Sequence, residues 1–253
     1  MKALAYIGLA ALLALPATAS AQAPKKGGTL VYAIGAETPT YDCSATDTYA
    51  GLHFLAPFYS TLLKFDLAAY PKVMGDLAES WTISPDKKTY TFKLRNNVTW
   101  HDGSPFSSAD IKATYDRLRN PPTGVVSTRK ATFADIETID TPDPTTVVFK
   151  LSAVTPAMLE HFASPWNCVY SAAKLKDDPA FPTKQIMGTG AFKFTEHVKG
   201  SHVAGVKNDK YFLPDRPYLD GFKGVFILQP AAMLNALQGR SEEHTSELQS
   251  PMY

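Results

Sequence analysis

The chain has 253 residues, of which 45% are hydrophobic and 19% are charged, and its formal net charge is +1. This composition is typical of a globular protein and excludes a disordered or fibrous one, while the near-zero charge offers no electrostatic attraction for nucleic acid. Fourteen phenylalanines, twelve tyrosines and nineteen prolines favour short strands and turns over a helix bundle, in one large domain or two small ones.

The first 23 residues have the pattern of a secretory signal peptide. One lysine precedes an apolar run from Ala3 to Leu15, and a proline and several small residues follow up to Ala23. The run is shorter than the ~20 apolar residues that span a bilayer. We therefore expect cleavage near Ala23 and an exported mature protein.

Export changes the interpretation of the two cysteines. Cys43 and Cys168 would lie in an oxidising compartment, where such a pair commonly forms one disulfide. Two free thiols remain the alternative. A zinc site is not expected, because no histidine lies near either cysteine at ligand spacing.

Downstream of residue 24 the hydrophobic pattern predicts many strands. The segment 27–37 alternates as a buried strand with Leu30, Tyr32 and Ile34 on one side. Further strands are expected at 89–94, 145–151, 190–198, 202–209 and 221–228.

Two segments have helical spacing instead. Phe54, Phe58 and Leu62 recur at this spacing, which predicts a helix running into a short strand that holds Phe65. A second helix is expected from Pro230, with Gly239 just past its end.

The pair His101–Asp102 raises the question of acid–base catalysis. Asp102 precedes a glycine and a proline follows shortly after, which favours a tight turn. Ser107 is then a good helix N-cap, with Asp110 three residues later as the partner of a capping box. A catalytic pair would need a nucleophile or metal nearby, so the sequence predicts a structural turn.

Several segments carry a resemblance to a known family. The stretch 77–118 contains LAESW, then YTFKLR in a strand, then VTWHDGSPFSSADI opening a helix. The stretch 187–212 contains MGTGAFKF and ends in NDKYF, and the pattern continues through 216–228 and 234–239. These motifs resemble the solute-binding proteins of peptide, dipeptide and nickel ABC importers (solute-binding protein family 5), in which LAESW ends a helix.

The resemblance implies a mixed α/β fold of the periplasmic-binding-protein type, a type II two-lobed receptor of the large peptide-binding subclass. This chain would supply the first lobe only, with the second lobe missing. Residues 24–49 together with 184–239 would form the ligand-facing part of that lobe, and residues 50–183 an inserted subdomain.

The resemblance also implies a function. We expect a monomeric, periplasmic substrate-binding component that captures a peptide or peptide-like solute and delivers it to an inner-membrane ABC permease. Binding of this kind needs a cleft between lobes that the ligand closes through its higher affinity for the closed form. No enzyme activity, cofactor or metal is expected.

The resemblance places the loop after the first strand in the cleft. A carboxylate in this loop would meet a ligand amino group, and a second loop would supply a stacking face and an amide. The ligand-binding candidates are Glu37, Thr40, Tyr41, Asp42, Trp166 and Asn167. Core packing for the aromatic rings and an Asx turn for Asp42 are the alternatives. A disulfide between Cys43 and Cys168 would join the two loops.

Two other functions compete with this interpretation. Family members handle nickel complexes and haem, and His197 and His202 flank a Gly-Ser turn, where we expect an exposed hairpin pair rather than a metal site. Ser84 and Ser171 each begin an S-x-x-K pattern of penicillin-recognising enzymes, but the companion motifs are absent.

The last segment, 240–253, differs in composition from what precedes it. Arg240 to Ser250 matches the in-frame translation of a common short-read sequencing adapter. We expect this tail to be an artefact outside the fold, and we expect residues 24–239 alone to express poorly.

Overall fold

The computed structural model describes residues 24–247, so the predicted signal peptide lies outside the described residues. The strands are β1 (Thr29–Ile34), β2 (Leu63–Phe65), β3 (Val73–Gly75), β4 (Ala78–Ile83), β5 (Thr89–Leu94), β6 (Ile136–Asp143), β7 (Thr146–Leu151), β8 (Phe192–Val198), β9 (His202–Lys207) and β10 (Gly221–Phe226). The α-helices are α1 (Tyr49–Leu55), α2 (Ser108–Arg119), α3 (Met158–Phe162), α4 (Ala172–Asp177), α5 (Phe181–Lys184) and α6 (Pro230–Glu247), and η1 (Cys43–Ala45) and η2 (Ala131–Phe133) are short 3-10 turns.

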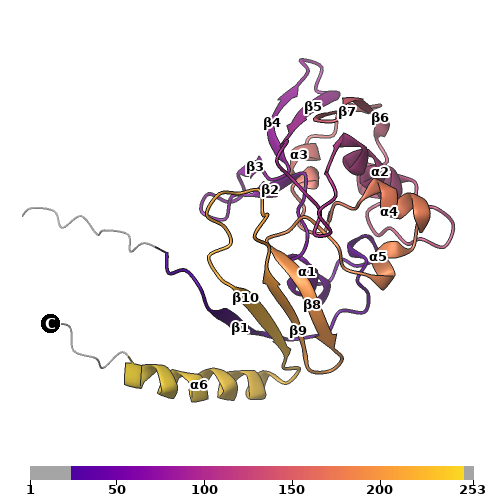
Figure 1. Cartoon of the computed structure of the whole chain (residues 1–253). Helices are drawn as coiled ribbons and strands as arrows, with labels where there is room; N and C mark the ends of the chain where they lie inside the picture. The colour runs from indigo at the N-terminus through magenta and orange to yellow at the C-terminus, as the bar shows by residue number, and fades with distance from the viewer. Residues whose placement is uncertain (1–23, 248–253) are drawn as a thin grey trace, which may run out of the picture.

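The first sheet joins the two ends of the described chain. Its strand order is β1-β10-β9-β8, with β1 parallel to β10 and the other pairs antiparallel. The carboxyl ends of β1 and β10 and the β8–β9 turn therefore share one edge of the sheet, beside the start of α6 (Figure 1). The segments that leave this edge can approach a common ligand.

The second sheet, β4-β5-β7-β6, is antiparallel throughout. One face is buried and contacts α2, as the predicted alternation in β5 and β7 requires. Tyr90, Phe92 and Phe149 are at most 4% exposed and lie in this core. The predicted strands at 89–94 and 145–151 are confirmed.

The buried apolar residues form two clusters. The larger lies between the second sheet and its helices. The smaller lies under the first sheet and includes Ile34, Phe54, Phe58, Tyr170 and Phe222. Helix α1, from its second residue on, and the segment around Tyr170 fall inside the range 50–183, yet both pack with the first sheet. The division of the chain into a lobe and an insert stays a prediction.

Four expected elements differ in the structure, two of them near the start of the described chain. Helix α1 ends at Leu55, because Pro57 follows, and Phe58 and Leu62 reach the core from a loop. Strand β1 is an edge strand rather than a buried one, so that Leu30 is 49% exposed.

The other two differences concern strand β4 and the end of helix α6. LAESW begins strand β4 and does not end a helix, because its backbone pairs with β5, with Trp81 opposite Phe92. Helix α6 continues to Glu247 instead of ending before Gly239. That glycine has no positive φ, so it does not form a left-handed cap, and a helical glycine costs only about 1 kcal/mol.

The HDG segment forms the predicted turn and cap. The Asp102 carboxylate accepts hydrogen bonds from the backbone N–H and the hydroxyl of Ser104, at 3.0 and 2.6 Å. Asp110 accepts from the backbone N–H of Ser107 at 2.8 Å, which completes the capping box of α2. Its other oxygen accepts from Ala172 at the start of α4 at 2.7 Å. The prediction that Asp102 shapes a turn is confirmed.

Candidate ligand-binding site

The loop after β1 leaves the carboxyl edge of the first sheet and carries four of the predicted residues. In open α/β sheets this edge is where ligands commonly bind. The loop runs from Gly35 to Thr48, where the Thr48 hydroxyl accepts from Gly51 and caps α1. The segment 164–168 lies beside it, because Cys43 and Cys168 are joined by a disulfide with their Cα atoms 5.9 Å apart.

Glu37 is bound to the β8–β9 hairpin. One carboxylate oxygen lies 2.7 Å from Nε2 of His197, and the other accepts from the backbone N–H of Gly200 at 3.0 Å. Nδ1 of His197 lies 2.6 Å from the hydroxyl of Tyr41, whose ring stacks on Phe54. The Glu37 side chain is 24% exposed, so it is partly accessible while it holds the hairpin.

The expected exposed histidine pair is wrong. The side chain of His197 is only 12% exposed and faces Glu37, whereas His202 is 11% exposed and contacts Glu196 at 3.0 Å. His202 pairs with Val198 in the hairpin register, so its side chain points to the face opposite to that of His197.

Asp42 is buried and has partners within the protein. The guanidinium of Arg117 on α2 binds both of its oxygens, at 3.2 and 2.5 Å. The same carboxylate accepts from the backbone N–H of Ser44 and from the hydroxyl of Tyr170. Its partners leave it no open face for a ligand amino group.

Arg129 forms hydrogen bonds with both loops. Its guanidinium donates to the carbonyl oxygens of Cys43, Thr46 and Trp166. It also donates to the side-chain oxygen of Asn167 at 2.9 Å. Burial lowers the pKa of this arginine, and the carbonyl partners compensate for the lost water.

The remaining candidates differ in accessibility. Asn167 is 1% exposed, and its amide also donates to the carbonyl of His161, so both ends of the side chain have partners. The Thr40 hydroxyl accepts from the backbone N–H of Asp42. Trp166 is half-buried, and its indole N–H donates to the carbonyl of Thr48 at 3.2 Å. Glu37, Thr40, Tyr41 and Trp166 thus remain the candidates that a ligand can reach.

Sequence reasoning missed three residues of this site. Arg117 and Arg129 lie 75 and 83 positions from the loop residues Asp42 and Thr46 that they contact, and nothing local indicates that pairing. Tyr49, which is 69% exposed, stands next to the Trp166 ring. Tyr49 could have been found from the sequence. Thr48 is a typical N-cap residue directly after the suspected binding loop, and this pattern places Tyr49 at the start of a helix.

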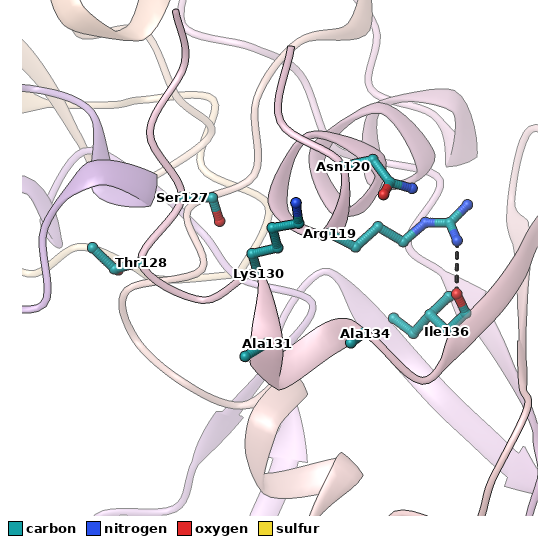
Figure 2. A pocket seen from close by; sticks show the side chains of 8 residues that line it. All are labelled: Arg119, Asn120, Ser127, Thr128, Lys130, Ala131, Ala134 and Ile136. Atoms are coloured by element: carbon teal, nitrogen blue, oxygen red, sulfur yellow. Dashed lines mark hydrogen bonds between the residues drawn. The ribbon is translucent and has the colours of Figure 1, made fainter. Parts of the chain in front are cut away.

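A pocket of about 510 Å³ lies elsewhere, between the end of α2 and η2 (Figure 2). Its Arg119 is engaged by the carbonyl of Ile136 at 2.7 Å and by Asp116 at 2.9 Å. None of the predicted ligand-binding residues lines it. Within residues 24–247 no group of three or more His, Cys, Asp or Glu side chains is placed to hold a metal ion. No helix in that range is long and apolar enough to cross a membrane.

The fold is that of the periplasmic binding proteins. The chain superposes on the PBP AgaA of A. tumefaciens R10, solved with agropinic acid, with a TM-score of 0.78 and 31% identity over 83% of this chain and 42% of that one. DppA of Helicobacter pylori, solved with the peptide STSA, gives a TM-score of 0.77 and 25% identity over 86% and 46%.

The sequence comparison defines the family. The model for bacterial extracellular solute-binding proteins, family 5 Middle, matches residues 72–249. A Brucella ovis protein named as an ABC transporter peptide-binding protein is 35% identical over 200 residues, which is 77% of this chain and 37% of that protein. The chain therefore belongs to the family 5 bacterial extracellular solute-binding proteins, and it spans about two fifths of the length of these relatives.

Proposed function

We propose that this chain is the ligand-facing first lobe of a substrate-binding component of an ABC importer. The protein captures a peptide or peptide-like solute in the periplasm and delivers it to an inner-membrane permease, without catalysing a reaction. In this proposal residues 24–49 and 184–239 form the ligand-facing part, residues 50–183 form the insert, and the signal peptide is removed near Ala23.

The arrangement of the two loops at the carboxyl edge of the first sheet supports this proposal. Glu37 and Tyr41 meet at His197 of the β8–β9 hairpin, and Trp166, from a distant part of the chain, donates to the carbonyl of Thr48 at the end of the same loop. The disulfide and the hydrogen bonds of Arg129 hold the two loops in place. Less conformational entropy is therefore lost when a ligand binds to them. A partly accessible carboxylate and aromatic rings are groups suited to a peptide.

The serines, the histidine and the aspartate that were candidates for catalysis form structural hydrogen bonds instead. Ser171 is the N-cap of α4 and accepts from the backbone N–H of Lys174. Ser84 donates to Asp86 in the β4–β5 turn. His101 and Asp102 form hydrogen bonds with different partners. These contacts support a binding role over the hydrolase alternative.

The test measures binding by the protein expressed from the complete open reading frame at its locus. Di- and tripeptides of defined sequence are added, and thermal unfolding and heat of binding are recorded. At a ligand concentration 100 times its Kd, binding stabilises the folded protein by about 2.7 kcal/mol. We expect at least one peptide class to do so, and Trp166→Ala to weaken it.

The matched control is Tyr70→Ala, since Tyr70 is 71% exposed in the β2–β3 connection, away from the site. Stabilisation by a nickel–histidine complex or by haem, with none by peptides, would instead assign the protein to metal-complex binding. If Tyr70→Ala weakens peptide binding as much as Trp166→Ala does, the ligand site does not lie at the carboxyl edge of the first sheet.

A further inference from the structure

Three aromatic rings form a continuous exposed surface beside the candidate site. The Tyr49 ring lies 5.8 Å from the Trp166 ring and 5.9 Å from the His53 imidazole, measured between centroids. Tyr49 is 69% exposed, His53 is exposed and Trp166 is half-buried. We call Trp166, Tyr49 and His53 the aromatic platform.

The Trp166 part of the platform is held in place by hydrogen bonds and by the nearby disulfide. The Trp166 indole N–H donates to the carbonyl that precedes Tyr49, and Arg129 donates to the Trp166 carbonyl at 3.0 Å. The disulfide through Cys168 lies two residues further along the chain. An indole ring that is fixed in this way loses little conformational freedom when a ligand stacks on it.

The two segments that supply the platform carry carboxylates but no lysine or arginine. Residues 35–63 contain three carboxylates, Glu37, Asp42 and Asp47, and neither lysine nor arginine. Residues 160–173 contain Glu160 and again no lysine or arginine. Asp47 is exposed and precedes Tyr49 by two residues in the sequence.

The guanidinium of Arg129, which donates to the Trp166 carbonyl, is directed inward. All three nitrogens of Arg129 donate to protein oxygens, among them the carbonyls of Cys43, Thr46 and Trp166. Its donors are therefore already occupied and do not extend over the rings. An incoming ligand therefore meets the aromatic faces and not these donors.

We propose that the platform binds a planar cationic group of the solute, which in a peptide is the guanidinium of arginine. A guanidinium stacks on tyrosine and tryptophan faces, is attracted by their quadrupole, and is more weakly hydrated than an ammonium group. The exposed carboxylate of Asp47, two residues before Tyr49 in the sequence, would attract the cation. This inference rests on the proposed function and adds the class of side chain that the site selects.

The experiment uses the protein from the complete open reading frame and three tripeptide sets, with arginine, citrulline or leucine at each position in turn. Citrulline keeps the shape of arginine but lacks its charge. We expect arginine at one position to bind about tenfold more tightly than citrulline, a difference of ~1.4 kcal/mol. Tyr49→Ala and Asp47→Asn should each reduce that ratio, while Tyr49→Phe should preserve it.

The outcomes separate this inference from the proposed function. Tight binding of all three sets with equal affinity would overturn the arginine preference and leave the peptide-binding function intact. A ratio that survives both Tyr49→Ala and Asp47→Asn would place arginine recognition elsewhere and overturn the inference. If no tripeptide binds, both proposals fail together, and thermal unfolding of each variant checks that it is folded.

Discussion

The Nε2 atom of His101 lies 3.0 Å from the carbonyl oxygen of Gly190, and Nδ1 of the same ring accepts from the backbone N–H of Gly188. The imidazole thus joins the HDG turn to the segment that leads into β8. That segment lies against the Phe58 backbone, where a Cβ on Gly188 would meet the Phe58 carbonyl oxygen at 2.1 Å. This contact requires a neutral ring, because Nδ1 must accept a hydrogen bond.

Acidification should therefore destabilise the protein through His101. Burial lowers the pKa of this imidazole below its ordinary value of 6.5. The unfolded chain then binds more protons, so the stabilisation is complete above about pH 6.5 and is lost as pH falls toward the folded pKa. Gly190 and Asp102 oppose the shift, and Lys193 adds to it.

His101→Asn should lower stability at pH 7.5 by roughly 1–3 kcal/mol, because it leaves Gly188 and Gly190 with poorer partners. It should also flatten the loss of stability between pH 7.5 and 5.5, measured by urea unfolding. The exposed His53 provides the control substitution His53→Asn. An unchanged pH dependence in the His101 variant would contradict the neutral-ring account.

Removal of the disulfide should cost about 2–5 kcal/mol, because the bond closes a loop over a sequence separation of 125 residues. The substitution is Cys43→Ala with Cys168→Ala, and the measurement is thermal unfolding with and without a reductant. Reductant should lower the Tm of the parent protein and leave the double variant unchanged. A parent protein that is insensitive to reductant under unfolding conditions would argue against the bond.

Breaking the buried ion pair should cost more than breaking an exposed one. Arg117→Met leaves the Asp42 carboxylate buried without its cation, and we expect a loss of about 3–5 kcal/mol. Adding Asp42→Asn should recover part of that loss in a double-mutant cycle measured by urea unfolding. The exposed pair of Lys184 and Asp178 is the control, because Lys184→Met should have little effect. Equal losses for the two pairs would refute a structural role for Asp42.

Glu37 should hold the tip of the β8–β9 hairpin. Glu37→Ala removes the acceptor for the Gly200 N–H and the partner of His197. Trypsin cleavage after the exposed Lys199 should then become several-fold faster, as followed by mass spectrometry. Glu196→Ala, which alters the His202 contact on the opposite face, is the control. A rate that Glu37→Ala does not change would mean that the turn is held by the strands alone.

Local signals predicted the parts of the fold that depend on local chemistry. Alternation in β5 and β7 is readable because one face of each strand is buried and the other is not. The capping box at Ser107 and the Asp102 turn are readable because their partners lie within three residues. Strand β4 was missed because its pairing with β5, rather than its own residues, makes it a strand.

The site depended on contacts that span most of the chain. Asp42 looked like a ligand carboxylate because its partner, Arg117, lies 75 residues away. The same reason concealed Arg129. Trp166 was identified from its residue type. Its neighbour Tyr49 was not, because the packing of α1 on β1 determines which side of this helix is exposed.

The location of the ligand site is the central claim, and hydrogen exchange with and without bound peptide tests it most directly. The protein from the complete open reading frame is compared in both states by mass spectrometry. We expect slower exchange in residues 35–49 and 164–168 when peptide is present. Protection confined to the pocket around Arg119, or no change in either of the two loops at saturating peptide, would contradict it.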